Sequence, residues 1–330
     1  MRFYTQQHPH YCGIDLHART MYLCIVNQAG AIVLHRNMKA DPDSFLKAVA
    51  PFRQDIVVAV ECIFTWYWLA DLCAREKIAF VLGHALYMKA IHGGKAKNDK
   101  IDAHKIAGLL RGGMIPEADV YPEGMRSTRD LLRRRMHLMR QRAELLAHVQ
   151  NTNHQYNLPE IGKKISYRCN REGVAERFAD PSVRSNVTFD LKRIGFYDDL
   201  LNQIELDILR HAKPYDANTF HLLDSVPGVG KILALVLLYE ILVKSKKESA
   251  GKFYGTSGNK IGNAHLKWAF SGAAVGFLRN NPQGQAYLAR LEKKHGKAKA
   301  LTALAHKLAR AVYHMLRRKE AFDMKRFVNR

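Results

Sequence analysis

The sequence predicts an α/β domain at the N-terminus followed by a mainly α-helical region. Three observations predict this. Five short segments rich in apolar and β-branched residues lie within the first 84 residues, helix signals follow the third, fourth and fifth of them, and beyond residue 122 apolar residues recur at helical spacing. The resulting order, β-β-β-α-β-α-β-α, is typical of one mixed sheet with helices on its faces.

The predicted elements of the first domain follow in order. Three strands are predicted over residues 10–18, 21–28 and 31–39, and the sequence Asp41-Pro-Asp-Ser44 predicts the start of a helix. A fourth strand over 55–62 leads into a helix over 64–76. A fifth strand over 78–84 precedes a further helix and a loop over 93–113, within which residues 99–102 are expected to be helical.

Four acidic residues occupy the points where this order brings distant segments together. Asp15 lies on the first strand and Glu61 at the end of the fourth, while Asp99 and Asp102 are three residues apart and share one face of a helix. A ribonuclease-H-type fold gathers such acids around divalent metal. Converging carboxylates repel one another unless cations neutralise them.

Metal binding by these acids would suit phosphodiester chemistry. Two Mg²⁺ ions about 4 Å apart hold the attacking and leaving oxygens of an in-line phosphoryl displacement. The alternative is that the four are ordinary surface acids. His17 and His104 lie near the acidic residues and are candidates to support them, although lone histidines are more often structural or solvent-exposed.

Composition favours a polyanionic partner. The chain of 330 residues has 52 Lys and Arg against 30 Asp and Glu, a net charge of +22. No run reaches the 18 apolar residues of a spanning helix, and the N-terminus has no signal-peptide core, so a membrane location is not expected. Five cysteines without a Cys-x-x-Cys pair predict reduced thiols in a cytoplasmic protein. Association with the bacterial nucleoid is also expected.

The predicted domains are 1–122, a basic helical connector at 123–212, and a helical C-terminal domain at 213–330. A long amphipathic helix is predicted from 123 to about 156, a loop-rich connection over 158–190, and another helix over about 190–212. The long helix either packs or dimerises, or it lies on a phosphate backbone. Its candidate nucleic-acid-binding residues are Arg133, Arg134, Arg135 and Arg140.

Two glycine-containing segments of the C-terminal domain are candidate phosphate contacts. The first is Val226-Pro-Gly-Val-Gly230, which is typical of a helix-hairpin-helix turn whose backbone N–H groups bind phosphate. Its candidate residues are Gly228, Gly230 and Lys231. The alternative is a simple tight turn, and a P-loop is excluded because Ile232 follows Lys231.

The second segment runs from Lys244 to Asn263 and is dense in Gly, Ser and Lys. Ser249 is a candidate nucleophile, because Lys246, Lys247 and Lys252 could stabilise a pentavalent phosphorane beside it. Alternatively, this is a flexible basic segment that touches nucleic acid. Tyr254 is a second candidate nucleophile.

The chain resembles the DEDD transposases of bacterial insertion sequences that encode a bridge RNA, the bridge-RNA-guided serine recombinases. Five motifs carry the resemblance in family order: Gly13-Ile-Asp-Leu-His17, Val60-Glu61, Lys97-Asn-Asp-Lys-Ile-Asp-Ala103, Val226-Pro-Gly-Val-Gly230, and Glu248-Ser-Ala-Gly-Lys252 through Gly262-Asn-Ala-His-Leu266. One departure is that Val243 leads almost directly into Lys244, where the family has an additional stretch.

The resemblance implies a RuvC-like first domain, with Asp15, Glu61, Asp99 and Asp102 as the metal-binding quartet, and a C-terminal transposase domain with Ser249 as the nucleophile. It implies strand exchange between donor and target DNA through a phosphoserine intermediate, with a guide (bridge) RNA that selects both DNAs by base pairing. A homo-oligomer, dimer or tetramer, is also expected. Two alternatives remain: a metal-dependent junction-resolving nuclease without a catalytic serine, and an inactive nucleic-acid-binding remnant.

Overall fold

The structure is a computed structural model that describes residues 2–91, 98–212, 216–245 and 263–329. The chain divides into two compact units, Met1–Glu123 and Gly124–Arg330. The predicted acids lie in the first unit. The boundary predicted at residue 212 lies inside the second unit.

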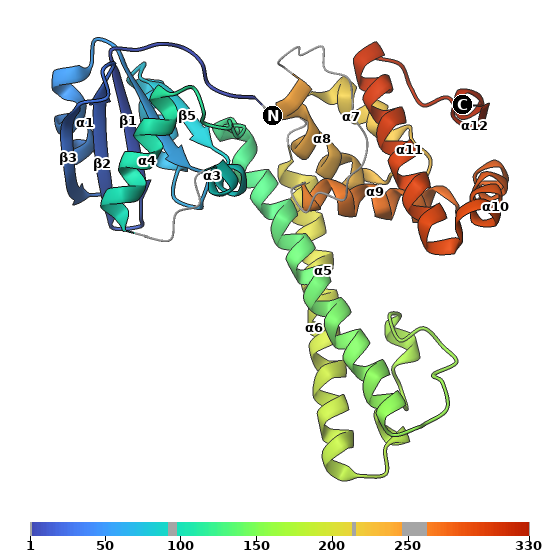
Figure 1. Ribbon diagram of the computed structural model, residues 1–330. Helices are drawn as coiled ribbons and strands as arrows, with labels where there is room; N and C mark the ends of the chain where they lie inside the picture. Colours follow the sequence, from blue (N-terminus) through green and yellow to red (C-terminus); the bar gives the residue numbers. More distant parts are fainter. Residues whose placement is uncertain (1, 92–97, 213–215, 246–262, 330) are drawn as a thin grey trace. The chain divides into compact units, whose positions relative to one another are not determined.

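Five strands form one mixed β-sheet in the described part of the first unit (Figure 1). They are β1 (His10–Leu16), β2 (Thr20–Asn27), β3 (Ile32–Lys39), β4 (Ile56–Glu61) and β5 (Ala79–Gly83). Their order across the sheet is β3-β2-β1-β4-β5. The pairs β1–β2 and β2–β3 are antiparallel, whereas β1–β4 and β4–β5 are parallel. The predicted mixed sheet is confirmed.

Helices follow the strands in the predicted order. They are α1 (Pro42–Val49), α2 (Tyr67–Arg75), α3 (Ala85–Ile91) and α4 (Asp99–Arg111), with a 3-10 turn at Ala50–Phe52. The start of α1 agrees with its sequence signal, because the Asp41 carboxylate accepts a hydrogen bond from the Ser44 backbone N–H and Pro42 occupies the first turn. Local sequence therefore specifies where this helix begins.

The sheet carries an apolar core on each face. Side chains alternate along β1, so that Cys12, Ile14 and Leu16 join one core and Tyr11 joins the other. The first core also contains residues of α1 and α2, including Phe45 and Leu69. The second core contains the apolar side of α4: Ala103, Ile106, Ala107, Leu109 and Leu110. Helix α4 therefore covers one face of the sheet, and α1 and α2 cover the other.

The described part of the second unit is helical. Its α-helices are α5 (Glu123–Gln155), α6 (Pro181–His211), α7 (Ala217–Asp224), α8 (Lys231–Ser245), α9 (Ala264–Phe277), α10 (Pro282–His295), α11 (Lys297–Arg318) and α12 (Met324–Asn329). Short 3-10 turns occur at Arg168–Asn170 and Ala175–Arg177. The predicted long helix over 123–156 is confirmed as α5.

Helices α5 and α6 form an antiparallel pair (Figure 1). Arg135 contacts Glu205 near one end of the pair, and His148 contacts Asp190 toward the other. Near the tip, Leu145 and Val149 pack with Val187, Ile194 and residues of the connecting segment. This tip has its own apolar core, which fixes the connection between the two helices.

The predicted start of the second helix was wrong. We expected a loop to residue 190, but α6 begins at Pro181 and continues through that residue. Asp180 caps it by accepting hydrogen bonds from the Ser182 and Val183 N–H groups. An Asp-Pro-Ser sequence is a recognised start signal, but the weak apolar periodicity of the following residues concealed it.

The remaining helices share one larger core with parts of α5 and α6. Helix α8 is apolar almost throughout, and its residues from Ala234 to Tyr239 are buried in this core. The apolar run that begins at residue 232 therefore forms a helix whose central residues, 234–240, are buried. Among the described residues, no helix is both long and apolar enough to cross a membrane.

Candidate metal centre

The end of β1 places Asp15 on the α4 face of the sheet. Asp15 lies two residues beyond Gly13 and so points to the same face. Ile14 pairs with Val60 in the parallel β1–β4 ladder, so Asp15 and Glu61 occupy the next position on adjacent strands. Strand register therefore places Asp15 and Glu61 side by side at the carboxyl ends of β1 and β4, on one face of the sheet.

Gly13 lets α4 approach this face closely. A Cβ atom at Gly13 would lie 2.3 Å from the Ala103 carbonyl oxygen and 2.3 Å from the Ala107 nitrogen. Ala103 and Ala107 are themselves fully buried. Because the helix backbone rests on the glycine, the first turn of α4 reaches the end of β1.

That first turn contains the other two acids. Asn98 caps α4, since its side chain accepts a hydrogen bond from the Lys100 N–H, and Asp99 and Asp102 lie in the first turn. Negative charge is favoured at this end of a helix by the helix dipole. Lys105 Nζ lies 3.3 Å from Asp102 Oδ1 and partly balances its charge.

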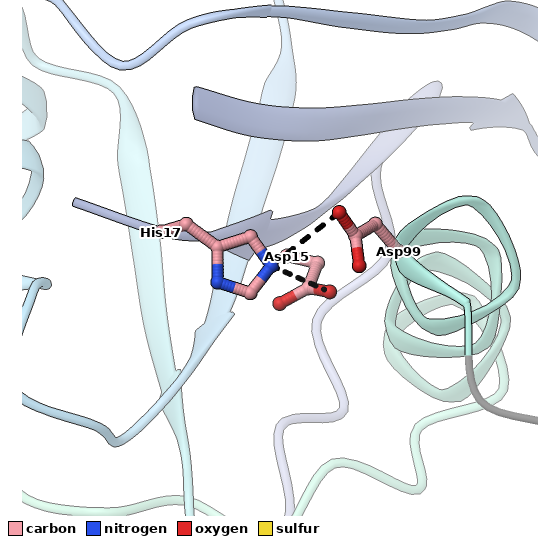
Figure 2. A group of neighbouring side chains, drawn as sticks. All are labelled: Asp15, His17 and Asp99. Carbon is pink, nitrogen blue, oxygen red and sulfur yellow. Dashed lines mark ion pairs between the residues drawn. The ribbon is translucent and has the colours of Figure 1, made fainter. Parts of the chain in front are cut away.

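His17 lies between the two nearest carboxylates. Its Nε2 atom is 3.5 Å from Asp15 Oδ2 and 3.5 Å from Asp99 Oδ2. Dashed lines in Figure 2 mark both contacts. One ligand atom from each of these three residues lies within 4.8 Å of the others. Carboxylate oxygens and an imidazole nitrogen are suitable donors for a divalent cation. These donors therefore fit a metal ion.

The electrostatics of Asp15 also fit a cation. Burial raises the pKa of its carboxyl, and the charges of Asp99 and Asp102 raise it further, while His17 opposes the shift. Asp99 and Asp102 thus both act on Asp15 through space. A divalent ion would offset the repulsion and favour the deprotonated carboxylate.

Glu61 and Asp102 are less closely engaged than Asp15 and Asp99. Within the described chain, the close group of possible ligands comprises Asp15, His17 and Asp99. Glu61 is half-buried at the adjacent strand end, and Asp102 is one helical turn along from Asp99 and contacts Lys105. The four predicted acids thus share a region, but only two of them belong to its tight centre.

Sequence reasoning undervalued His17. The sequence alone favours a structural or solvent-exposed role for a lone histidine, whereas the His17 ring contacts both central carboxylates. The signal was the two-residue spacing from Asp15. On a strand, that spacing places both side chains on one face, and His17 directly follows β1.

The predicted nucleic-acid-binding arginines of α5 divide into two groups. Arg133 pairs with the buried Glu240, and Arg135 pairs with Glu205 while also lying over the Trp268 ring. Both side chains therefore make contacts within the second unit. Arg134 and Arg140 are exposed instead, so they are the better placed to meet a phosphate backbone.

The Pro-Gly turn connects α7 and α8. Gly228 has a φ of +81°, and a Cβ there would lie 2.2 Å from the Gly276 carbonyl carbon and the Phe277 nitrogen of α9. Its backbone is therefore packed on another helix. Gly230 and Lys231 are exposed at the start of α8. Ser249, Tyr254 and the lysines at 246, 247 and 252 lie outside the described residues.

Sequence reasoning missed a polar cluster that joins α5, α8 and α9. Glu240 is 3% exposed and contacts Arg129 and Arg133. The Asn263 amide donates to Glu240 at 2.7 Å, and the same side chain caps α9. Burial and the neighbouring arginines lower the pKa of His265 to about 4. A glutamate within an apolar run was the available sign of a buried ion pair.

The mixed sheet and the acids at its edge are consistent with a ribonuclease-H-like fold. Residues 12–157 match the family model of the IS110-type DEDD transposases, which is described as a transposase family. Over this part of the chain, the match supports a likeness to the IS110-type DEDD transposases of insertion sequences. All four predicted acids lie within the matched range. No curated protein matches the chain.

Proposed function

We propose that this chain is the recombinase of a bacterial insertion sequence and that it exchanges DNA strands under the guidance of a structured RNA. One observation carries the catalytic part of the proposal. Asp15 and Asp99, 84 positions apart in the sequence, meet across His17 at the edge of the sheet. Their convergence lies inside the range matched by the transposase family.

Asp15, Glu61, Asp99 and Asp102 would hold Mg²⁺, most simply as two ions. Bound magnesium stabilises negative charge on the attacking and leaving oxygens of a phosphoryl transfer. Asp15 is the least exposed carboxylate of the tight centre, so its position depends most on the fold. His17 would orient Asp15 and Asp99 through the shared Nε2 contact.

Ser249 is the proposed nucleophile. Attack by its Oγ atom forms a phosphorus–oxygen bond and breaks the bond to one strand oxygen, which leaves as a hydroxyl after gaining a proton. A hydroxyl of the partner strand then attacks the phosphoserine and releases the serine. Lys246, Lys247 and Lys252 lie close to Ser249 in the sequence and would reduce the negative charge of the transition state.

The proposed guide RNA and the donor and target DNAs suit the charge of the chain. A net charge of +22 attracts all three polyanions. Arg134 and Arg140 would contact phosphates from the exposed side of α5. Base pairing with the RNA would supply the sequence specificity, as in other RNA-guided systems. A homo-oligomer would bring two DNA duplexes together.

A metal-dependent, junction-resolving nuclease is the second candidate function. The acidic centre supports this second function, because the described residues include possible ligands for a metal ion. Water bound to such a metal can replace a serine as the nucleophile. The two functions differ in one product. Only the serine mechanism leaves DNA covalently attached to the protein.

The test uses full-length protein purified with its co-purifying RNA, which is sequenced to design matching DNAs. Wild type is compared with Asp15→Asn and Ser249→Ala, and with Asp43→Asn as a control at an acid of α1 outside the acidic centre. Cleavage in Mg²⁺, covalent adducts on a denaturing gel and recombined product are measured. RNA retention and thermal unfolding report folding.

We expect Asp15→Asn to abolish cleavage, Ser249→Ala to abolish the adduct, and Asp43→Asn to behave as wild type. Cleavage without adduct in the wild type would favour the nuclease. An equal adduct with Ser249→Ala would move the nucleophile elsewhere, with Tyr254 tested next. Wild-type cleavage by Asp15→Asn would overturn the metal assignment.

A further inference from the structure

Helices α11 and α12 and the residues between them line an open cavity of about 230 Å³ in the second unit. One part of its lining is apolar: Ala311, Met315, Ala321, Phe322 and Phe327. The two phenylalanine rings lie 5.4 Å apart, centroid to centroid. The cavity therefore offers an aromatic surface of the kind on which a planar group can stack.

The lining also contains a buried amine. Lys307 is only 9% exposed, and its Nζ atom has no hydrogen-bond partner among the described residues. It lies 3.9 Å from the centroid of the Tyr287 ring and 4.9 Å from that of Phe327. Cation–π contacts hold the ammonium in place but leave its hydrogen-bond donors unused. A ligand acceptor would satisfy them.

The rest of the lining is rich in cations. Arg310, Arg318 and Arg326 line the cavity together with two acids, Glu320 and Asp323. Arg326 contacts both acids and offsets one of their two negative charges, so Lys307, Arg310 and Arg318 leave the lining with a net positive charge. Arg310 and Arg318 form no ion pair within the described part of the chain. The cavity is thus positive, with two guanidinium groups available for an anion.

We propose that this cavity binds one unstacked nucleotide of a single-stranded nucleic acid. The base packs against the Phe322 and Phe327 surface, and Lys307 donates to its polar edge or to the adjoining phosphate. Arg310 and Arg318 contact the flanking phosphates. Among anions, a nucleotide is the class that combines a flat apolar body with adjacent phosphates. The proposal does not depend on the acidic centre or on Ser249.

The experiment measures binding of full-length protein to labelled hexanucleotides by fluorescence anisotropy. Four probes are used: oligo(dT), oligo(rU), and an abasic chain of the same length and charge for each sugar. Ala311→Phe fills the cavity, Lys307→Met removes the buried charge at similar size, and Arg318→Gln removes one rim charge. Arg317→Gln is the matched control, since Arg317 is an exposed neighbour on α11 that does not line the cavity.

We expect the wild type to bind a base-containing probe at least about fivefold more tightly than its abasic counterpart. Ala311→Phe should abolish this preference and Lys307→Met should weaken binding severalfold. Arg318→Gln should reduce the slope of log affinity against log salt by about 0.7, while Arg317→Gln leaves it unchanged. A preference for the ribose or the deoxyribose probe identifies the strand as RNA or DNA.

Several outcomes would overturn the proposal. They are a base preference retained in a folded Ala311→Phe protein, wild-type binding by Lys307→Met, and equal losses with Arg318→Gln and Arg317→Gln. Displacement of the probes by an acidic hexapeptide more readily than by unlabelled oligonucleotide would assign the cavity to a peptide. If Ala311→Phe fails to fold, the pair at Arg317 and Arg318 still decides.

Discussion

Gly13 and Ala107 are in such close approach that a single methyl group at Gly13 would lie 2.3 Å from the Ala107 nitrogen. The contact joins a β-strand to a helix backbone, and neither partner is a flexible side chain that could move aside. The positions of Asp99 and Asp102 relative to Asp15 therefore depend on the absence of a side chain at residue 13.

Gly13→Ala should lower both stability and metal-dependent cleavage. Overpacking of this kind costs about 1–3 kcal/mol, and any relief requires α4 to move away from β1. Urea unfolding and cleavage in Mg²⁺ measure the two effects. Gly108→Ala on α4 is the control, since a Cβ there meets no atom within 4 Å. An unfolding midpoint unchanged by Gly13→Ala would contradict the proposed packing role.

Asp15→Asn should stabilise the metal-free protein near neutral pH. Burial and the nearby Asp99 raise the pKa of Asp15 in the folded state. As the pH rises from the pKa of Asp15 in the unfolded chain to its higher pKa in the folded protein, the wild type therefore loses stability. Above the folded-state pKa, it remains less stable by this amount. Asparagine removes this loss. Thermal unfolding with EDTA from pH 3 to pH 8 checks the sign, and Mg²⁺ should stabilise the wild type but not the variant.

Glu240→Gln should destabilise the second unit strongly. Burial alone would raise the pKa of Glu240, but the hydrogen bond from Arg133 and the charge of Arg129 lower it. Loss of one partner of a buried ion pair typically costs about 3–5 kcal/mol. The ion pair contributes to stability above the pKa that Glu240 has in the unfolded chain. This contribution is lost as the pH falls through the lower pKa that Glu240 has in the folded protein. Urea unfolding at pH 7 and pH 3 measures it.

The matched control for Glu240→Gln is the same substitution at Glu144, an exposed residue of α5. That change should alter stability by less than about 0.5 kcal/mol. Equal unfolding midpoints for the Gln variants at 240 and 144 would show that the buried cluster contributes nothing.

The arginines of α5 should separate by function. Arg134→Gln and Arg140→Gln should each reduce the salt dependence of duplex binding by about 0.9 in log–log slope, with stability unchanged. Arg133→Gln and Arg135→Gln should lower the unfolding midpoint, because both side chains form ion pairs within the unit. Anisotropy titrations across a salt series and thermal unfolding give the two readouts. The reverse pattern would show that the paired arginines are the ones that bind DNA.

Much of the first unit follows from local signals. The alternation in β1 and the continuous apolar run of β4 predict their strands, and Asp41-Pro42 predicts the start of α1. The convergence of Asp15 with Asp99 was expected from the element order. Their shared contact with His17 was not, because it depends on the few ångströms by which α4 approaches Gly13.

The second unit was less predictable because a charged side chain does not reveal its partner in the sequence. Arg133, Arg134 and Arg135 are consecutive, yet one pairs with Glu240, one is exposed, and one pairs with Glu205. Successive helix positions point about 100° apart, so three adjacent arginines meet three different surroundings. Which surroundings these are depends on the packing of distant helices.

Helix α5 contributes to two separate apolar cores. Met125 and Leu132 belong to the large core of the second unit, whereas Leu145 and Val149 belong to the core at the tip of the α5–α6 pair. A helix of 33 residues is about 50 Å long. It is therefore held in place by a separate apolar core near each end. Its length exceeds one turn of duplex DNA, which is about 34 Å.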